Sequence, residues 1–227
     1  MKTKIIGNVN EKLDEIENNS IDLIFTSPPY WKGFEYESYF NSYLQYIEFC
    51  NIWIKKIKNK LKKNGFFLLN IANDSETTIK AFELLNICTN NYWKLCDTII
   101  WNCYNRQPCN SNRRLTNQTE FIFLFRHNSS NMKINKNIDL EKYKNIFETK
   151  NVGNIWKIPF QINKKSNLKK ELSSKFGHSG WPKILCELVI DLFSNENDTI
   201  LDCFCGNFIL GDIAEKKKRN IIGIDLN

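Results

Sequence analysis

The sequence predicts an α/β protein whose mostly parallel sheet is covered by helices on both faces. Three observations predict this class. The chain has 227 residues, 42% of them hydrophobic, which suits one large domain with a modest insertion. Short apolar runs alternate with amphipathic helical patterns along the chain. Two of these runs end in unusual loops, and ligands of such sheets bind beyond the carboxyl ends of the strands.

Seven apolar runs predict the strands, at residues 4–7, 21–25, 66–71, 98–101, 121–125, 199–204 and 221–225. Helical periodicity predicts a helix containing Leu13 and Ile16, helices over 39–61, 77–88 and 182–193, and about ten helical residues after Asn207. We expect the basic stretch at 62–64 to form the last turn of the second helix and Gly65 to stop it. Pro182 stands at the predicted start of its helix.

The positive charge of the chain is concentrated in one segment. The whole sequence has 32 Lys and Arg against 25 Asp and Glu, but residues 126–183 hold 13 against 4. A lysine-rich stretch is most often a solvated loop. If the flanking parts form an enzyme that acts on nucleic acid, this segment becomes a candidate polyanion-binding insertion.

The composition also excludes several classes of protein. No apolar run approaches the roughly 18 residues that a membrane span needs, and no signal peptide opens the sequence, so we expect a cytoplasmic protein without a membrane partner. The eight cysteines form no CxxC pair and no cluster with histidine at zinc spacing. We therefore favour reduced, mostly buried thiols over a disulfide framework, and we expect no metal site.

The loop Ser27-Pro28-Pro29-Tyr30 ends the second predicted strand. Two consecutive prolines make it rigid and extended, and a turn with a packed tyrosine is the simpler interpretation. The loop also offers a hydroxyl oxygen, a carbonyl beside an imide nitrogen that lacks a proton, and an aromatic plane. These groups can hold an exocyclic amine and stack on the base that carries it, once that base has left its duplex.

The strand at 199–204 leads into a short turn with the outline of a nucleoside-cofactor site. Gly206 permits close approach of the backbone, and Asp225, 19 residues later, ends the next strand where a carboxylate accepts hydrogen bonds from ribose. An ordinary βαβ unit looks similar. Because the sequence lacks GxGxxG, a dinucleotide is disfavoured.

Taken together, these motifs resemble the amino-group DNA methyltransferases that use S-adenosyl-L-methionine, in the permuted (beta-class) order that places the catalytic loop before the cofactor motif. Residues 21–30 match the catalytic strand and loop, 61–65 the helix end that follows, and 100–102 with 117–125 the paired strands before target recognition. Residues 178–190, 200–206 and 219–225 resemble the helix before the cofactor strand, the cofactor motif and the terminal strand.

The resemblance implies a Rossmann-like methyltransferase fold with a seven-stranded sheet. It divides the chain into a catalytic part (1–125), a basic target-recognition insertion (126–177) and a cofactor-binding part of the same sheet (178–227). Ser27, Pro28, Pro29 and Tyr30 become the catalytic residues. The cofactor-binding residues that the resemblance implies are Asp202, Cys203, Phe204, Gly206, Asp225, His178 and Pro182.

The expected partner is double-stranded DNA, with a cognate restriction endonuclease and a second copy of the chain as further candidates. The residues that we expect near nucleic acid are Trp31, Lys32, Arg106, Arg113, Arg114, Lys164, Lys165, Lys169 and Lys170. Packing alone is an equal explanation for Trp31, and a purely surface position is common for arginine.

Three alternatives remain open, and one of them is that the methylated substrate is RNA or a protein side-chain amide, of which the basic insertion disfavours protein. Serine at the first loop position favours cytosine N4 as the methylated atom over adenine N6, although the rule has exceptions in the family. The family's cofactor turn is typically Phe-x-Gly-Ser-Gly, whereas this chain has Phe208 at the second glycine position. If Phe208 closes the cofactor pocket, the chain is a non-catalytic DNA-binding relative.

Overall fold

The computed structural model describes residues 1–31, 37–72, 79–106, 108–147, 149, 151–160 and 180–226. Within them, one sheet of eight strands runs in the order β1-β8-β7-β2-β3-β5-β4-β6. The strands are β1 (Lys2–Ile6), β2 (Ile21–Thr26), β3 (Leu61–Ile71), β4 (Lys94–Asn102), β5 (Thr119–Arg126), β6 (Ile155–Lys157), β7 (Thr199–Asp202) and β8 (Asn220–Asp225). The predicted α/β class with a Rossmann-like sheet is confirmed.

The sheet is mostly parallel, as predicted. Five of its seven pairings are parallel, and only the two pairings of β5, with β3 and with β4, are antiparallel. The predicted number of seven strands is wrong, because the described residues contain an eighth, β6. This strand has three residues and pairs with β4 through Trp156 opposite Trp101. Only Trp156 of the three is buried, so β6 gives no apolar run in the sequence.

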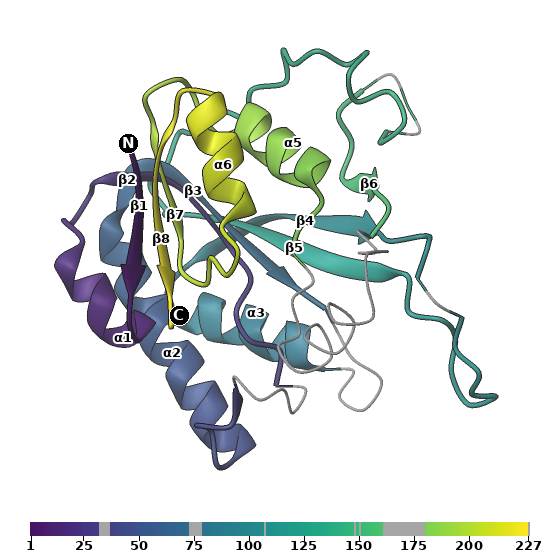
Figure 1. Ribbon diagram of the computed structural model, residues 1–227, viewed down its shortest axis with the longest axis horizontal. Helices are drawn as coiled ribbons and strands as arrows, with labels where there is room; N and C mark the ends of the chain where they lie inside the picture. The colour runs from purple at the N-terminus through teal and green to yellow at the C-terminus, as the bar shows by residue number, and fades with distance from the viewer. Residues whose placement is uncertain are drawn as a thin grey trace.

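Helices cover both faces of the sheet (Figure 1). One face carries α1 (Val9–Lys12), a 3-10 turn (Leu13–Glu15), α2 (Tyr43–Lys60) and α3 (Lys80–Asn90). The opposite face carries α5 (Lys183–Phe193) and α6 (Ile209–Lys216), coloured green and yellow in Figure 1. Each layer buries its own apolar cluster against the sheet, centred on Trp53 and Ile54 on the first face and on Leu188 and Val189 on the second.

The boundary between α2 and β3 differs from the prediction. The helix ends at Lys60 and the strand begins at Leu61, so the basic residues 62–64 belong to the strand rather than to a last helical turn. Leu61 is fully buried and pairs with Ile21. A Cβ at Gly65 would lie 2.8 Å from the carbonyl oxygen of Asp22, so this glycine permits the close approach of two strands and does not stop the helix.

The described part of the basic segment packs against the rest of the protein. Tyr143 is fully buried, and its hydroxyl donates a 2.6 Å hydrogen bond to Asp191 on α5. Trp156 and Ile158 are buried in the same cluster. The described residues between 126 and 160 therefore form more than a solvated loop, while the densest group of lysines, from Lys164 to Lys170, lies outside the described residues.

Six of the eight cysteines are buried, and all eight are free thiols. This agrees with the expectation of reduced, mostly buried cysteines. Among the helices that the structure describes, none combines the length and the apolar character that crossing a membrane requires.

Candidate functional site

The two loops singled out in the sequence lie side by side, because β2 and β7 are neighbours in the sheet. The strands pair in parallel through Leu23 with Ile200 and Ile24 with Leu201. At their carboxyl ends the Thr26 hydroxyl donates to Asp202 Oδ1 at 3.0 Å and accepts the Cys203 N–H at 3.1 Å. The structure therefore places the Ser27–Tyr30 loop and the turn at Gly206 at adjoining strand ends.

The Asp202 carboxylate is almost entirely buried at this junction. Burial, with a smaller contribution from the charge of Asp225, raises the pKa of Asp202 from 3.8 to about 7, although hydrogen bonds from the Phe204 N–H and from Thr26 act in the opposite direction. The Phe204 N–H reaches Asp202 Oδ1 at 3.1 Å. Asp202 therefore fixes the start of the cofactor turn from the inside.

Ser27 to Tyr30 form a loop that its neighbours hold in place. The Ser27 and Tyr30 hydroxyl oxygens are 2.7 Å apart. The Tyr46 hydroxyl of α2 donates to the Pro29 carbonyl oxygen at 2.8 Å. Pro28 is buried, whereas Ser27, Pro29 and Tyr30 are partly exposed. The loop therefore exposes polar atoms, while the hydrogen bond from Tyr46 of α2 holds its backbone.

Lys80 at the start of α3 clamps the end of this loop. Its side chain is buried, with 1% of the residue exposed, and its ammonium donates to the carbonyl oxygens of Tyr30 at 3.0 Å and Trp31 at 2.5 Å. Trp31 has a φ of 51°, in the left-handed region that costs about 1 kcal/mol or more for a residue with a side chain. The clamp offsets this strain and fixes the direction in which the chain leaves the loop.

Around the Tyr30 hydroxyl, polar groups from β3 and β5 converge. Glu120 Oε2 lies 3.3 Å from it and Asn70 Oδ1 lies 3.5 Å from it. Glu120, which is 5% exposed, also forms an ion pair with Arg106. Desolvation and the negative charge of Glu120 raise the pKa of Tyr30 well above its ordinary value, so this side chain acts as a neutral phenol.

The indole of Trp181 lies next to this cluster. Its ring stacks on Phe25, with centroids 4.0 Å apart and planes inclined by 9°, and its N–H donates to Asn70 Oδ1 at 2.7 Å. Pro182, the N-cap residue of α5, follows it and is buried. A Cβ at Gly180 would lie 2.9 Å from the Asn207 side chain, so the chain before α5 runs against the cofactor turn.

The turn after β7 has the properties of a nucleoside cradle. Gly206 has a φ of 48°, and a Cβ added there would meet nothing within 4 Å, which leaves open space beside the backbone. Its N–H donates to Asp225 Oδ2 at 2.6 Å, and its carbonyl oxygen accepts from the Lys4 ammonium at 3.1 Å. The carboxylate at the end of β8 and the open glycine turn fit the ribose and backbone contacts of a nucleoside cofactor.

The ring of Phe208 is buried between α6 and β8. The residue is the N-cap of α6 with a φ of 58°, and it is 7% exposed. A Cβ at Gly211 or at Gly223 would come within 2.8 Å of the phenyl ring, so both glycines leave room for it in the core between α6 and β8. The ring therefore fills space beneath the helix.

The other predicted cofactor residues take different positions. Phe204 is partly exposed, and its ring packs edge-on against Trp53 of α2 at 5.4 Å. Cys203 is fully buried and contributes its backbone N–H to Thr26. His178 lies outside the described residues.

The predicted nucleic-acid residues also take different positions. Trp31 is partly buried against Phe40 and Tyr46, and Arg106 is held between Glu120 and the face of Phe160, 4.9 Å from the ring centroid. Arg113 and Arg114 are exposed on the loop between β4 and β5, which projects from the sheet at the right of Figure 1. Lys32, Lys164, Lys165, Lys169 and Lys170 lie outside the described part of the chain.

Five residues of the site escaped the sequence interpretation, and they are Thr26, Asn70, Lys80, Glu120 and Trp181. Asn70 gave a signal, since it is a polar residue inside the apolar run 66–71 and is 1% exposed. Buried polar residues of this kind are paired, and they often support a site. Lys80 and Glu120 gave no comparable signal.

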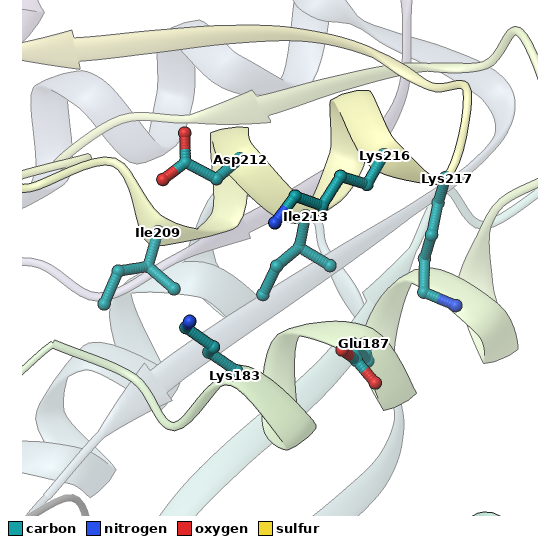
Figure 2. A pocket seen from close by; sticks show the side chains of 7 residues that line it. All are labelled: Lys183, Glu187, Ile209, Asp212, Ile213, Lys216 and Lys217. Carbon is teal, nitrogen blue, oxygen red and sulfur yellow. The ribbon is translucent and has the colours of Figure 1, made fainter.

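A shallow cavity of about 130 Å³ lies in a different place, between α5 and α6 (Figure 2). Its lining consists of Lys183, Glu187, Ile209, Asp212, Ile213, Lys216 and Lys217. Three of its charged groups are already paired, Asp212 with Lys2, Lys217 with Asp191 and Glu187 with Lys142. Because these side chains come from helix faces and not from strand ends, we assign no part of the nucleoside site to this cavity.

Comparison with known proteins gives consistent similarities. A family model described as DNA methylase matches residues 21–227. The Type II methyltransferase M.HinfI of Haemophilus influenzae is 29% identical over 242 residues, which cover 99% of this chain and 65% of that protein. The chain thus spans slightly less than two thirds of this relative's length.

Two solved structures share the fold. The PvuII DNA methyltransferase, described as cytosine-N4-specific, has a TM-score of 0.75 at 21% identity, over 100% of this chain and 83% of that one. The complex of M1.HpyAVI with SAM has a TM-score of 0.67 at 20% identity, over 100% of this chain and 94% of that one. At these identities the similarity shows a shared fold and nothing further.

Proposed function

The chain belongs to the DNA methylase family, and from this membership we propose that it is a site-specific DNA methyltransferase acting on the exocyclic amino group of a flipped base. The observation that carries the proposal is the buried Thr26–Asp202 junction, which places the Ser27–Tyr30 loop beside the Gly206 turn. A methyl donor and an amine can therefore be held at adjoining strand ends. Bringing two reactants into line supplies most of the rate enhancement that such a transfer needs.

S-adenosyl-L-methionine is the cofactor of this family, and it supplies an electrophilic methyl group on a sulfonium sulfur. Asp225 would accept hydrogen bonds from the ribose hydroxyls, and Gly206 would let the backbone approach the ligand. Phe204 offers a partly exposed ring as a wall of the pocket. Asp202 acts from inside the turn by fixing the backbone of Cys203 and Phe204 through Thr26 and its own carboxylate.

The catalytic loop holds the target base. The Ser27 hydroxyl oxygen and the Pro28 carbonyl oxygen accept hydrogen bonds from the amino group, and the ring of Tyr30 stacks on the base. This arrangement favours the geometry in which the nitrogen lone pair faces the methyl carbon. The nitrogen gains the methyl group as the bond from that carbon to the sulfonium sulfur breaks, which leaves a thioether, and the nitrogen then releases one proton to solvent without a covalent bond to the enzyme.

Cytosine N4 is the proposed position of methylation, and adenine N6 is the alternative. The proposal rests on Ser27 at the first position of the loop, where cytosine-N4 enzymes of the family commonly carry serine. Incubation of the purified chain with DNA and S-adenosyl-L-methionine, followed by nucleoside analysis, tests it. N4-methylcytosine is the expected product, and N6-methyladenine would overturn this choice of base.

DNA binding is proposed for the basic segment 126–177 and for the loop between β4 and β5. Arg113 and Arg114 are exposed on that loop, whose base joins the site through the Arg106–Glu120 ion pair. The likeness to M.HinfI supports a role in a restriction-modification system beside a cognate endonuclease. A homodimer is a further proposal, and gel filtration with light scattering tests it through a mass near twice the 26.8 kDa of one chain.

A non-catalytic DNA-binding relative is the second candidate, because Phe208 stands at a family glycine position. The burial of its ring against Gly211 and Gly223 speaks against blockage of the pocket. Calorimetric titration with S-adenosyl-L-methionine separates the two. Binding supports the methyltransferase, and an absence of detectable heat at a ligand concentration of about 1 mM would favour the non-catalytic relative.

A further inference from the structure

The amide of Asn70 has one orientation that satisfies its surroundings. The Trp181 indole N–H, which can only donate, meets Asn70 Oδ1 at 2.7 Å. On the other side of the amide, Nδ2 donates to Glu120 Oε2 at 3.0 Å and to the Phe121 carbonyl oxygen at 3.1 Å. Three partners therefore fix Oδ1 as the amide atom that faces the Tyr30 hydroxyl.

This orientation decides the direction of the hydrogen bonds at Tyr30. The hydroxyl lies 3.3 Å from Glu120 Oε2 and 3.5 Å from Asn70 Oδ1, and both atoms are acceptors. Glu120 is held in an ion pair with Arg106 through its other oxygen. The single hydroxyl proton of Tyr30 therefore points toward this carboxylate. Consequently, the proton in the 2.7 Å contact between Ser27 and Tyr30 belongs to Ser27.

The direction of these hydrogen bonds determines what Ser27 can offer to a substrate. A hydroxyl has one proton and two lone pairs, and the proton of Ser27 is used within the protein. Its lone pairs remain to accept a hydrogen bond from an exocyclic amino group. We infer that Glu120 is a positioning residue that acts through Tyr30 to keep Ser27 an acceptor, an inference that rests on the proposed function.

Replacing Glu120 by glutamine makes the opposite direction available. The glutamine amide can present its NH2 group to Tyr30, which then donates to Ser27. The Ser27 proton in turn points outward, where it hydrogen-bonds to the lone pair of the target nitrogen. That lone pair is the one that must attack the methyl carbon, so we expect methyl transfer to slow while the site keeps its shape.

The test is a double-mutant cycle on the single-turnover rate of DNA methylation. We expect Glu120→Gln to lower the rate by at least tenfold, with the Kd for S-adenosyl-L-methionine unchanged within twofold. Tyr30→Phe keeps the ring and removes the hydroxyl that links Glu120 to Ser27. In that background, Glu120→Gln should therefore lower the methylation rate by less than threefold. If Glu120 had only a structural role, Glu120→Gln would lower the methylation rate by the same factor in the wild type and in Tyr30→Phe.

Asp22→Asn is the matched control. Asp22 is a partly buried carboxylate in an ion pair with Lys62 and stands at the opposite end of β2 from Ser27. We expect its substitution to leave the methylation rate within twofold of the wild type. Additive costs in the cycle, or a Glu120→Gln rate equal to that of the wild type, would overturn the inference. A wild-type chain that methylates no DNA would overturn the proposed function itself.

Discussion

Thr26 and Asp202 are joined by a buried hydrogen bond of 3.0 Å between residues 176 positions apart in the sequence. Thr26 ends β2, just before the Ser27–Tyr30 loop, and Asp202 ends β7, just before the turn that contains Gly206. Since the Thr26 hydroxyl also accepts the Cys203 N–H, one side chain fixes the start of both loops. Any change in the separation of the two loops must disturb this bond.

The titration of Asp202 makes stability depend on pH. Its pKa is raised from 3.8 to about 7, so the folded protein holds a proton that the unfolded chain releases between these values. For an acid with a raised folded-state pKa, the free energy of unfolding falls as pH rises from about 4 to 7. Asp202→Asn keeps the acceptor oxygen and stays neutral. Its stability relative to the wild type should therefore grow across this range, by on the order of 4 kcal/mol.

Urea unfolding of the wild type and of Asp202→Asn at pH 4, 5, 6, 7 and 8, without cofactor, measures this difference. A difference that stays constant over the series would show that Asp202 is ionised in the folded protein throughout.

Loss of the Lys80 clamp should affect the catalytic loop. Lys80→Met keeps an unbranched apolar chain and leaves the carbonyl oxygens of Tyr30 and Trp31 without their ammonium donor. We expect a stability loss of roughly 2 kcal/mol, because buried acceptors lose a charged partner. The methylation rate should also fall by at least tenfold, since the loop is no longer fixed.

The matched control for this variant is Lys58→Met. The Lys58 ammonium likewise donates to two consecutive carbonyl oxygens, those of Asn91 and Tyr92, but at the far end of α3. Its methylation rate should equal that of the wild type. Equal losses of rate in the two variants would show that general destabilisation, not the loop, limits activity.

Restoring the family glycine at position 208 should not improve cofactor binding. Phe208→Gly relieves a positive φ but empties a core site beside Gly211 and Gly223, so we expect a net loss of about 3 kcal/mol of stability. Phe208→Leu keeps most of the buried carbon and should lose less. The Kd for S-adenosyl-L-methionine, measured by calorimetry, should not fall in either variant. A tenfold tighter Kd in Phe208→Gly would mean that the ring occupies cofactor space.

The lysine cluster of the basic segment should control the salt dependence of DNA binding. Replacing Lys164, Lys165, Lys169 and Lys170 by alanine should lower the slope of log K against log salt, by up to roughly 0.9 for each phosphate that the protein no longer neutralises. Lys216 and Lys218, at the C-terminal end of α6, serve as the control pair. An unchanged slope in the fourfold variant would mean that these lysines do not contact DNA phosphates and form only a solvated loop.

Much of the fold could be predicted because the buried strands are apolar runs between polar helices. The seven expected runs each overlap a strand, although the run at 199–204 extends two residues beyond β7, whereas β6 was missed because a three-residue edge strand buries only Trp156. The misplaced end of α2 has a similar cause. Gly65 followed a basic stretch as a helix stop would, but the approach of β3 to Asp22 determines its place.

Candidate site residues could be predicted where the chemically distinctive groups fall within one short segment. Residues 27–30 and 202–206 can be recognised as candidates from their composition and from their places at strand ends. Lys80, Glu120 and Trp181 act through single contacts made by elements far apart in the chain, and tertiary packing alone brings them to Tyr30 and Asn70. No local pattern encodes such contacts, so the support of the loop became visible only in three dimensions.

The most direct test of the account is modified-base sequencing of DNA from cells that express this chain, with Ser27→Ala as the comparison. We predict N4-methylcytosine at one recurring sequence with the wild-type chain, and loss of that modification with Ser27→Ala at equal protein level. DNA without any modified base, or modification that persists unchanged in Ser27→Ala, would contradict the assignment of this chain as a methyltransferase acting through the Ser27 loop.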